Sequence, residues 1–534
     1  MKKMWTKSIF AVAAALLFGI FLIPVSVSAA GADGTENTAS ETAGATAGWN
    51  GFHQSPDSQD WYYYKGGEVQ RGLNSVIKGT VNGTNAWWHV VDGEVTYDTT
   101  IAQNSRGWWC IKDGKVDFTD NGFATNSNGT YKLTRGKVTF KENGVIKFGK
   151  YWYNLSRGRL VTGPTVAKNK NGWWYIDRTG KVDFGYNGFA KNSNGWWYCK
   201  GGKVQFGTNS VVKGVVNGTN GWWHVVKGEV AFDNTVAKNS NGWWHIQNGK
   251  VNFGSDTVAK NSKGWWVIQN GKVNFKYNGF AKNSNGWWYC KGGKVQFGTN
   301  SVVKGAVNGT NGWWHVVKGK VAFDTTVAKN SNGWWYIEKG KVNFNADTVA
   351  KNSNGWWMIQ NGKVNFKFTG IASNSNGLWY INNGKVDFSA NGTFRSGEFL
   401  FDVNNGEAVE FGERVVQLVN SERRAQGLDP LKADTAMNKA AMVRAKELPS
   451  LFSHTRPDGS DCFTVLDELN ISYGAAGENI AGGQPSPEGV VASWMYSPGH
   501  RANILNENFT RIGVACYYSP SSSWTYNWVQ IFAN

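Results

Sequence analysis

The amino-acid sequence predicts a multidomain protein, in which a long array of β-hairpin repeats stacks into a solenoid and is followed by an α+β domain. Three observations lead to this prediction. The motif Gly-Trp-Trp recurs about every 22 residues in a chain with 30 tryptophans and 67 glycines. Short aromatic and β-branched runs meet two-residue turns in each repeat. From Phe411 onward the motif is absent, and helical periodicity takes over.

Residues 1–29 have the pattern of a secretory signal peptide. Lysines precede an apolar run from Ile9 to Ile23, and Val27, Ser28 and Ala29 supply the small residues of a cleavage site. Because the run is shorter than the roughly 20 residues that span a bilayer, we expect cleavage after Ala29. The mature protein should then be secreted, extracellular or attached to the cell wall, and should have no transmembrane segment. Residues 30–48, rich in Ala, Gly, Thr and Glu, are predicted to form a flexible linker.

Residues 49–409 contain the repeats. In the repeat at 239–253, an aromatic run is followed by Asn248-Gly249, a pair that favours the positive φ angles of a type I′ turn, and then by a second alternating run. A lone hairpin is only marginally stable in water, so we expect these units to stack and bury their faces against one another. A block that begins at Gly188 recurs almost verbatim at Gly279, which indicates duplication of a larger unit.

The paired tryptophans are the candidate ligand-binding residues of the array. Adjacent side chains on a strand point to opposite faces, so one ring should pack inside the solenoid and the other should lie on its surface or between hairpins. A ladder of such rings beside lysines suits sugars or a quaternary ammonium group. In the alternative, the next hairpin covers both rings and they bind nothing. The candidates are Trp173, Trp174, Trp222, Trp223, Trp243, Trp244, Trp265, Trp266, Trp313, Trp314, Trp334, Trp335, Trp356 and Trp357.

The positive charge of the protein lies in the repeats. The chain has a net charge of +18, whereas the segment from Glu410 has ten Lys and Arg against thirteen Asp and Glu. In an exported chain this charge favours anionic wall polymers such as teichoic acids, or acidic glycans, as partners and disfavours nucleic acid. Alternatively, the lysines are solvated residues at hairpin turns that keep a tryptophan-rich array soluble.

The repeats resemble the choline-binding and glucan-binding cell-wall repeats of Gram-positive surface proteins, which are also aromatic hairpins built around a Gly-Trp motif. The resemblance covers roughly Trp49 to Val409 and implies attachment to a wall polymer, such as teichoic acid, peptidoglycan or another glycan, between consecutive hairpins. Two features depart from that pattern. Trp-Trp replaces the usual Trp-Tyr-Tyr, and Lys-Val-Asn-Phe, from Lys250 to Phe253, stands where those families have Gly-x-Met.

Residues 410–534 are predicted to form the α+β domain. Helical spacing runs through 415–427, and Asp434 is placed to cap an alanine-rich helix. A short helix is expected at 488–494, and the tail alternates in two runs, within 512–528, around a Ser/Pro turn. Helices outside a terminal antiparallel hairpin predict a layered α-β-α sandwich.

Four motifs of this segment resemble the CAP superfamily, the group of cysteine-rich secretory, antigen 5 and pathogenesis-related proteins, in its short bacterial form. The resemblance implies a cleft lined by two histidines and two glutamates. His454, Glu478 and His500 match three of these positions, whereas Ser497 stands where many members have the second glutamate. The motifs are VVQLVNSERRAQGLDPL from Val415, FSHTRPDGS from Phe452, GENIAGG from Gly477 and SPGHRANILNENFTRIGVACYY from Ser497.

His454, Glu478 and His500 are therefore the candidate catalytic residues. The same set could ligate a divalent metal such as Zn²⁺, or act as a general base with its orienting partners. In the third interpretation they form a hydrogen-bonded cluster that closes the fold and catalyses nothing. Neither Gly-x-Ser-x-Gly nor His-Glu-x-x-His occurs in the chain, so a hydrolase would have to use water activated by metal, His or Glu.

Five cysteines are an odd number for an exported chain. Cys462 and Cys516 both lie in the C-terminal domain and are the predicted disulfide pair. Cys110, Cys199 and Cys290 lie in the repeats, and we expect them to be buried thiols.

Three functions fit the sequence. In the first, a secreted, wall-associated protein binds an envelope polymer through its repeats and displays the CAP domain as a binding module. In the second, the protein is an envelope hydrolase, a peptidase or a peptidoglycan-cleaving enzyme, that the repeats target to its substrate. In the third, it is a structural surface protein in which the array is a spacer.

Overall fold

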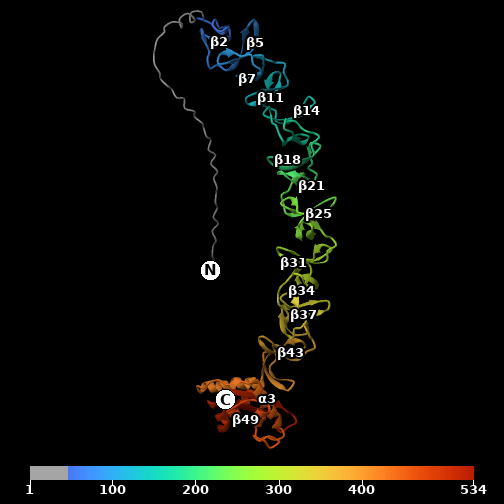
Figure 1. Ribbon diagram of the computed structural model, residues 1–534, viewed down its shortest axis with the longest axis vertical. Coiled ribbons are helices and arrows are strands. Elements are labelled where there is room, and N and C mark those ends of the chain that lie inside the picture. The colour runs from blue at the N-terminus through green and yellow to red at the C-terminus, as the bar shows by residue number, and fades with distance from the viewer. Residues whose placement is uncertain (1–45) are drawn as a thin grey trace, which may run out of the picture. The chain divides into compact units, whose positions relative to one another are not determined.

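The computed structural model describes residues 46–534 (Figure 1). The predicted signal peptide and the predicted linker up to residue 45 lie outside the described residues. The described residues divide into two compact units, one of residues 46–193 with Cys199–Val204 and one of Asn194–Tyr198 with Gln205–Asn534. The described part of the first unit consists of hairpin repeats, and the second unit holds further repeats and the C-terminal domain.

Each repeat is built on a short antiparallel hairpin. In one of them, β24 (Thr235–Asn239) pairs along its length with β25 (Gly242–Gln247). β25 then turns at Asn248-Gly249, with φ of 49° and 79°, into the two-residue β26 (Lys250–Val251). The type I′ turn is as predicted. The main partner of the Gly-Trp-Trp strand, however, is the strand before it, because the run after the turn leaves the ladder after two residues.

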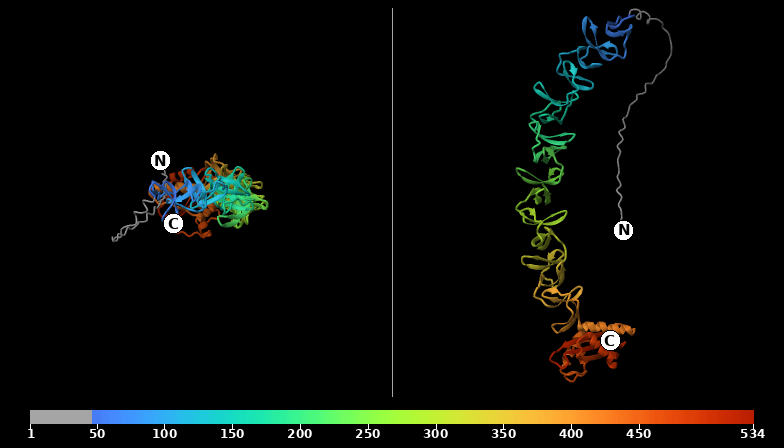
Figure 2. Two further views of the ribbon diagram at one scale, coloured as in Figure 1. Left: turned by 90° about the horizontal axis from the view of Figure 1, so that it is seen from above. Right: turned by 180° about the vertical axis from the view of Figure 1, so that it is seen from behind.

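Hydrogen bonds join each repeat to its neighbours. β25 pairs with β29 (Lys272–Val273) of the next repeat, with Trp244 opposite Lys272. Asn239 Nδ2 donates to the carbonyl of Val211 in the preceding repeat at 3.3 Å, and its Oδ1 accepts from Trp244 Nε1 at 3.0 Å. Figure 2 shows the successive repeats of the second unit following one another in chain order. Stability in such an array accumulates through contacts between neighbours.

The strands that contain Gly-Trp-Trp, or its degenerate form, share this pattern. They are β2 (Trp61–Lys65), β5 (Thr84–Val91), β8 (Gly107–Lys112), β11 (Gly129–Thr134), β14 (Tyr151–Ser156), β17 (Gly172–Ile176), β19 (Gly195–Lys200), β22 (Thr219–Val226), β25, β28 (Gly264–Gln269), β31 (Gly286–Lys291), β34 (Thr310–Val317), β37 (Gly333–Glu338), β40 (Gly355–Gln360) and β43 (Gly377–Asn382). One more hairpin follows, formed by β45 (Gly392–Ser396), β46 (Phe399–Asn404) and β47 (Glu407–Glu410).

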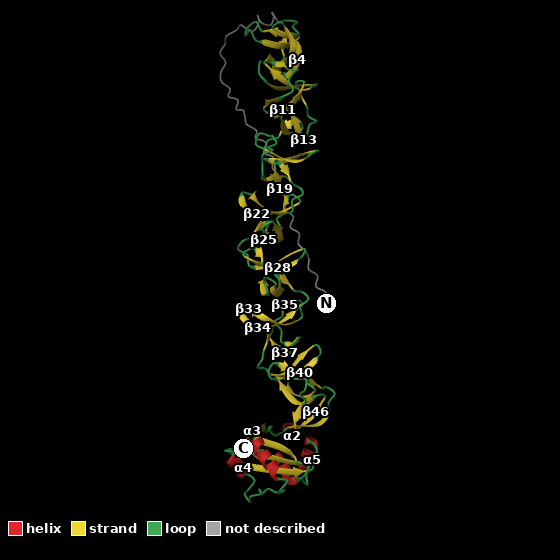
Figure 3. Cartoon of the chain, turned by 90° about the vertical axis from the view of Figure 1, so that its right-hand side faces the viewer, coloured by secondary structure: helices red, strands yellow, loops and turns green. Residues whose placement is uncertain are grey.

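The C-terminal domain has a four-stranded sheet flanked by helices, which Figure 3 shows in red beside the strands. Its strands lie in the order β48 (Lys432–Ala433), β50 (Arg511–Tyr518), β51 (Tyr526–Ala533) and β49 (Ala476–Gly482), and only β48 runs parallel to its neighbour. Its helices are α2 (Phe411–Ala425), α3 (Thr435–Glu447), α4 (Thr464–Glu468), α5 (Pro487–Tyr496) and α6 (Pro498–Ile504).

Two apolar cores lie on the two faces of this sheet. Phe411 of α2 and Trp494 of α5 pack with Trp528 in one core, and Met437 of α3 and Leu466 of α4 pack in the other. The predicted α-β-α sandwich is therefore confirmed. Among residues 46–534, no helix is both long and apolar enough to cross a membrane.

The predicted disulfide between Cys462 and Cys516 is wrong. Both cysteines are free and buried. Cys516 of β50 packs in the core on the α2 face, whereas Cys462 lies just before α4, which packs on the other face of the sheet. The sheet thus separates the two thiols. Cys110, Cys199 and Cys290 are buried thiols, as expected.

Candidate functional site

The repeats form clusters of three aromatic rings between consecutive hairpins. Trp243 of one repeat contacts Trp266 and Phe275 of the next, with ring centroids 5.3 and 5.9 Å away, and Trp266 and Phe275 are 5.5 Å apart. Equivalent clusters are Trp108–Tyr131–Phe140, Trp152–Trp174–Phe184, Trp265–Trp288–Phe297, Trp334–Trp357–Phe366 and Trp356–Trp379–Phe388.

The ring that faces solvent in each cluster is the phenylalanine. Phe275 is 47% exposed, whereas Trp243 and Trp266 are half-buried. In three of the seven candidate pairs the second ring is buried and the first is half-buried, whereas in the other four pairs both rings are half-buried. None of the fourteen candidate tryptophans is exposed, and the expectation that one ring of each pair is free for a ligand stays a prediction. The phenylalanines were not predicted as ligand-binding residues, although Lys-Val-Asn-Phe marks their position.

The longer repeats arrange their tryptophans differently. Trp222 packs in one hydrophobic cluster with Trp244, and Trp313 packs with Trp335. The second rings, Trp223 and Trp314, are buried, as is Trp174, and Trp173 is half-buried. A cleft of about 370 Å³ opens beside one such repeat. Its lining includes His224, Trp243, Lys238 and Lys263.

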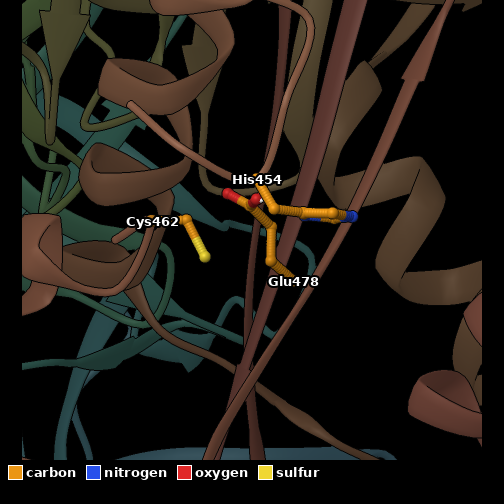
Figure 4. A group of neighbouring side chains, drawn as sticks. All are labelled: His454, Cys462 and Glu478. Carbon is orange, nitrogen blue, oxygen red and sulfur yellow. Dashed lines mark hydrogen bonds and ion pairs between the residues drawn. The ribbon is translucent and has the colours of Figure 1, made fainter. Parts of the chain in front are cut away.

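In the C-terminal domain, the carboxyl group of Glu478 is held by two neighbours. Arg444 Nε donates to Oε2 at 2.9 Å, and Arg444 Nη2 donates to Oε1 at 3.2 Å. His454 Nδ1 lies 2.8 Å from Oε1. The side chains of Arg444 and Glu478 are 0% and 1% exposed, whereas that of His454 is 56% exposed. A buried carboxylate therefore orients an imidazole that is itself more than half exposed to solvent. Figure 4 shows the two side chains together with Cys462.

The ion pair of Glu478 continues into a chain of alternating charges. Arg444 also bonds Glu447, which accepts from Arg456 Nη2 at 2.8 Å, and Arg456 in turn pairs with Glu468 of α4. Arg456 follows His454 by two residues, so these bonds tie the loop of His454 to α3 and α4. This network fixes the position of the imidazole.

The two histidines of the domain lie in different electrostatic surroundings. The hydrogen bond to Glu478 raises the pKa of His454 above its ordinary value. Burial lowers the pKa of His500, and the charge of His454 lowers it further. The backbone carbonyl of His500 accepts from Asn479 Nδ2 at 3.0 Å. The structure therefore brings all three candidate catalytic residues into one region, with only His454 bonded directly to Glu478.

The residues present do not fit a divalent metal. The potential ligand atoms within 4.8 Å of one another belong to His454, Cys462 and Glu478, and His500 is not in this group. Figure 4 shows His454 and Cys462 on either side of Glu478. Both oxygens of Glu478 already accept from Arg444, so a metal ion would lie beside a guanidinium cation. Burial raises the pKa of the Cys462 thiol to about 12, which keeps it protonated.

Sequence reasoning located Glu478 but missed Arg444, Glu447 and Arg456, which hold it in place. A signal was available, because Arg444 falls on the buried stripe of α3 with Met437, Ala440, Ala441 and Leu448. An arginine on the apolar face of a helix requires a buried carboxylate, since a charge is not buried without a partner.

Comparison with protein-family models identifies both parts of the chain. The model described as the cysteine-rich secretory protein family (CAP) matches residues 416–532. The C-terminal domain is therefore a CAP domain, and the region before it carries choline-binding repeats. The model described as choline-binding repeat matches residues 97–117, 165–183, 185–205, 232–252, 255–274, 276–296, 323–343, 345–365 and 367–387.

Two curated relatives come from Bacillus subtilis (strain 168). The uncharacterized protein YkwD is 44% identical over 121 residues, which are 22% of this chain and 47% of YkwD. The uncharacterized membrane protein YlbC is 29% identical over 114 residues, which are 20% of this chain and 33% of YlbC. This chain thus spans half or less of the length of the relatives that it matches.

Solved structures with each type of domain are also similar to parts of this chain. An extracellular SCP-domain protein from Bacillus anthracis has a TM-score of 0.21 and 14% identity, and the match covers 48% of this chain and 88% of that one. Choline binding protein F from Streptococcus pneumoniae has a TM-score of 0.18 and 15% identity, and the match covers 55% and 94%. Together, the repeats and the CAP domain fit a cell-wall-associated protein.

Proposed function

We propose that this is a secreted, wall-attached protein whose repeats bind a polymer of the envelope and display the CAP domain as a binding module. The recurrence of the three-ring clusters carries this proposal. Each cluster offers an exposed phenylalanine and a half-buried tryptophan side by side, for example Phe275 and Trp243. Such rings stack on the apolar faces of sugars or polyols, and several weak sites on one chain give a high avidity for a repetitive polymer.

Sedimentation of the purified full chain with cell walls tests the binding role. Replacing Phe275, Phe297 and Phe366 together by serine removes the exposed ring from three clusters, and we expect less protein to sediment with the walls. The matched control is Tyr496→Ser, which removes a 93% exposed ring from the CAP domain. Free choline and soluble teichoic acid serve as competitors. Equal sedimentation of all three proteins would contradict a role for the clusters, and a failure of the unchanged chain to sediment would favour the spacer function.

A second candidate function, envelope hydrolysis, rests on a separate observation in the CAP domain. The exposed imidazole of His454 is oriented by the buried carboxylate of Glu478, and such a pair can act as a general base on water. Release of peptidoglycan fragments by the full chain tests it, with His454→Ala and His500→Ala as variants. Turnover that neither substitution changes would exclude this site, and a lack of turnover by the unchanged chain would leave the CAP domain as a binding module.

A further inference from the structure

The second tryptophan of many pairs, called the inner ring below, already has the ammonium group of a lysine over its face. In seven repeats, the lysine that begins Lys-Val-x-Phe in one hairpin extends over the second tryptophan of the hairpin before it. The distances from Nζ to the ring centroid are 5.5 Å for Lys115 over Trp88, 5.1 Å for Lys137 over Trp109, 5.2 Å for Lys272 over Trp244, 5.5 Å for Lys294 over Trp266, 5.9 Å for Lys320 over Trp288, 5.3 Å for Lys363 over Trp335 and 5.5 Å for Lys385 over Trp357.

The glycine of Gly-Trp-Trp makes room for this lysine. A Cβ atom placed on Gly264 would lie 2.6 Å from Lys294 Cε, and one on Gly355 would lie 2.3 Å from Lys385 Cε. The glycine and the second tryptophan point to the same face of the strand. The lysine stem therefore crosses the glycine and brings its ammonium group to the indole ring. This arrangement recurs with the repeat and is a built feature of the array.

These ammonium groups keep their charge available to a ligand. None of the seven lysines forms an ion pair with a carboxylate among residues 46–534. Lys272, Lys294, Lys363 and Lys385 are exposed. The array holds most of the positive charge of a chain with a net charge of +18. A quaternary ammonium ligand would have to displace a tethered cation from the ring and would meet repulsion from its neighbours.

One complete cluster differs from the others. In Trp356–Trp379–Phe388, the residue opposite Trp379 is Glu407 instead of a lysine. Gly377 lies two residues before Trp379, and a Cβ atom placed on it would meet no atom within 4 Å, so no side chain crosses this glycine. Glu229 likewise lies opposite Trp197. These two positions act as internal controls. A carboxylate beside the tryptophan favours binding of a cationic ligand, whereas a lysine at the same place disfavours it.

The cleft beside Trp243 also brings aromatic rings and lysine ammonium groups together. It has a volume of about 370 Å³, and its lining brings Lys238 and Lys263 next to that ring. Lys263 Nζ lies 5.7 Å from the centroid of Trp243, and the exposed Phe275 contacts the same indole. The cleft thus offers an aromatic surface and two ammonium groups at one place.

We infer that the repeats in which a lysine covers the second tryptophan bind an anionic polymer with a phosphate or carboxylate group on each unit, and that they do not bind a quaternary ammonium group. This inference rests on the proposed wall-binding function and specifies its ligand. The carbon faces of the polymer stack on the phenylalanine and on the outer tryptophan. Its anionic groups pair with the lysines that lie over the inner rings.

Titration of the full chain by calorimetry, with three probes, tests this inference. The probes are poly(glycerol phosphate), polygalacturonate and choline chloride, so that phosphate, carboxylate and ammonium are compared directly. One variant replaces Lys272, Lys294 and Lys363 by glutamine, which keeps the stem and removes the charge. The matched control replaces three turn lysines by asparagine, the residue that other repeats use at the same positive-φ position. These are Lys227, Lys318 and Lys339.

We expect the unchanged chain to bind a polyanion with an affinity that falls as salt is raised. The ring-lysine variant should lose about tenfold in affinity or more, and the turn-lysine control less than about threefold, since only the first set lies at the binding surface. Binding of poly(glycerol phosphate) alone would identify phosphate as the anion, and binding of polygalacturonate alone would identify carboxylate. Equal losses in the two triple variants would overturn the inference.

The choline titration and the wall-displacement assay distinguish a failure of this inference from a failure of the wall-binding function. Any choline binding should be confined to the two glutamate positions and should disappear in Glu229→Lys combined with Glu407→Lys. Choline binding that survives this change would overturn the inference, as would wall binding that poly(glycerol phosphate) and polygalacturonate both fail to displace. In those cases the wall-binding function would still stand. A chain that does not sediment with cell walls at all would refute the wall-binding function itself.

Discussion

At the scale of single residues, Glu478 organises the group of charged side chains around Arg444 and His454 in the CAP domain. Its side chain is 1% exposed and shares the buried Arg444 with Glu447. Two acids and one base in the interior are stable only as a paired set, because an unpaired buried charge loses its hydration without compensation. The position of His454 depends on this set, since its imidazole bonds the same carboxylate.

Replacing Arg444 by methionine should therefore destabilise the CAP domain strongly. We expect its free energy of unfolding to fall by about 3 to 5 kcal/mol, because Glu478 loses its buried partner. Urea unfolding followed by near-UV circular dichroism measures the change. Lys446→Met on the same helix, where the side chain is 40% exposed, should change the stability by less than about 1 kcal/mol. A loss from Arg444→Met no larger than this control would contradict the role of the ion pair.

The two histidines should titrate in opposite directions from the ordinary value of 6.5. The pKa of His454 is raised, so its contribution to stability is present below pH 6.5 and is lost as pH rises through its own pKa. The pKa of His500 is lowered, so its contribution is present above pH 6.5 and is lost as pH falls. The domain should be most stable near pH 6.5.

Histidine ring resonances in NMR spectra, assigned with His454→Asn and His500→Asn, measure both pKa values. We expect the resonance of His454 to shift at a higher pH than that of His500. The reverse order would show that the bond between His454 and Glu478 does not hold in solution.

Part of each site could be predicted at this scale. Local motifs located His454, Glu478, His500 and the tryptophan pairs, because those residues stand in conspicuous patterns. Phe275 was missed because it lies just beyond a two-residue strand, where alternation no longer predicts exposure. Arg444 was missed because its partner Glu478 is 34 residues away. Such a contact depends on tertiary structure, which periodicity does not reveal.

At the scale of elements, the last hairpin, β45 to β47, packs with the CAP domain. Leu400 is 3% exposed and belongs to the core that contains Phe411 and Trp494. Lys446 Nζ lies 2.7 Å from Glu398 Oε1, and the guanidinium of Arg395 lies over the ring of Tyr518. The predicted domain boundary at 409/410 therefore separates residues that share one core.

The substitution Leu400→Ala in the full chain tests this packing. We expect the free energy of unfolding of the CAP domain to fall by about 2 to 5 kcal/mol, as for other leucines deleted from a core. Phe399→Ala is the control, because the neighbouring ring is 46% exposed and its loss should cost less than about 1 kcal/mol. Unfolding by urea, followed at the CAP domain, gives both values. If the two variants unfold alike, the hairpin is not part of the domain core.

The elements of the CAP domain differ in how well their sequences predict them. The expected helices at 415–427 and 488–494 correspond to α2 and α5. Both could be predicted because amphipathic spacing and Pro487 are local signals in the sequence. β49 was not predicted, since Gly, Ala and Asn have low strand propensity. It forms because β51 pairs with it along its whole length and buries its side chains. Tertiary contacts therefore override local preference in that strand.

At the scale of the whole molecule, the proposed wall-binding function makes the number of binding sites depend on the number of repeats. Gly188 and Gly279 begin near-identical blocks, and Tyr-Asn precedes each of them. Deleting residues 188–278 therefore joins equivalent positions and removes one complete copy of the duplicated block. We expect the shortened chain to fold and to bind cell walls several-fold more weakly, because avidity falls as sites are lost. Sedimentation over a range of wall concentrations measures this, and an unchanged affinity would contradict multivalent binding.

The five cysteines of this chain are buried as thiols, and this affects how the fold forms. No covalent cross-link between distant segments has to form before the fold is complete. Folding then needs neither an oxidant nor a thiol-exchange catalyst. The protein should therefore reach the same fold in oxidising and in reducing surroundings, and a thiol reductant should leave its stability unchanged.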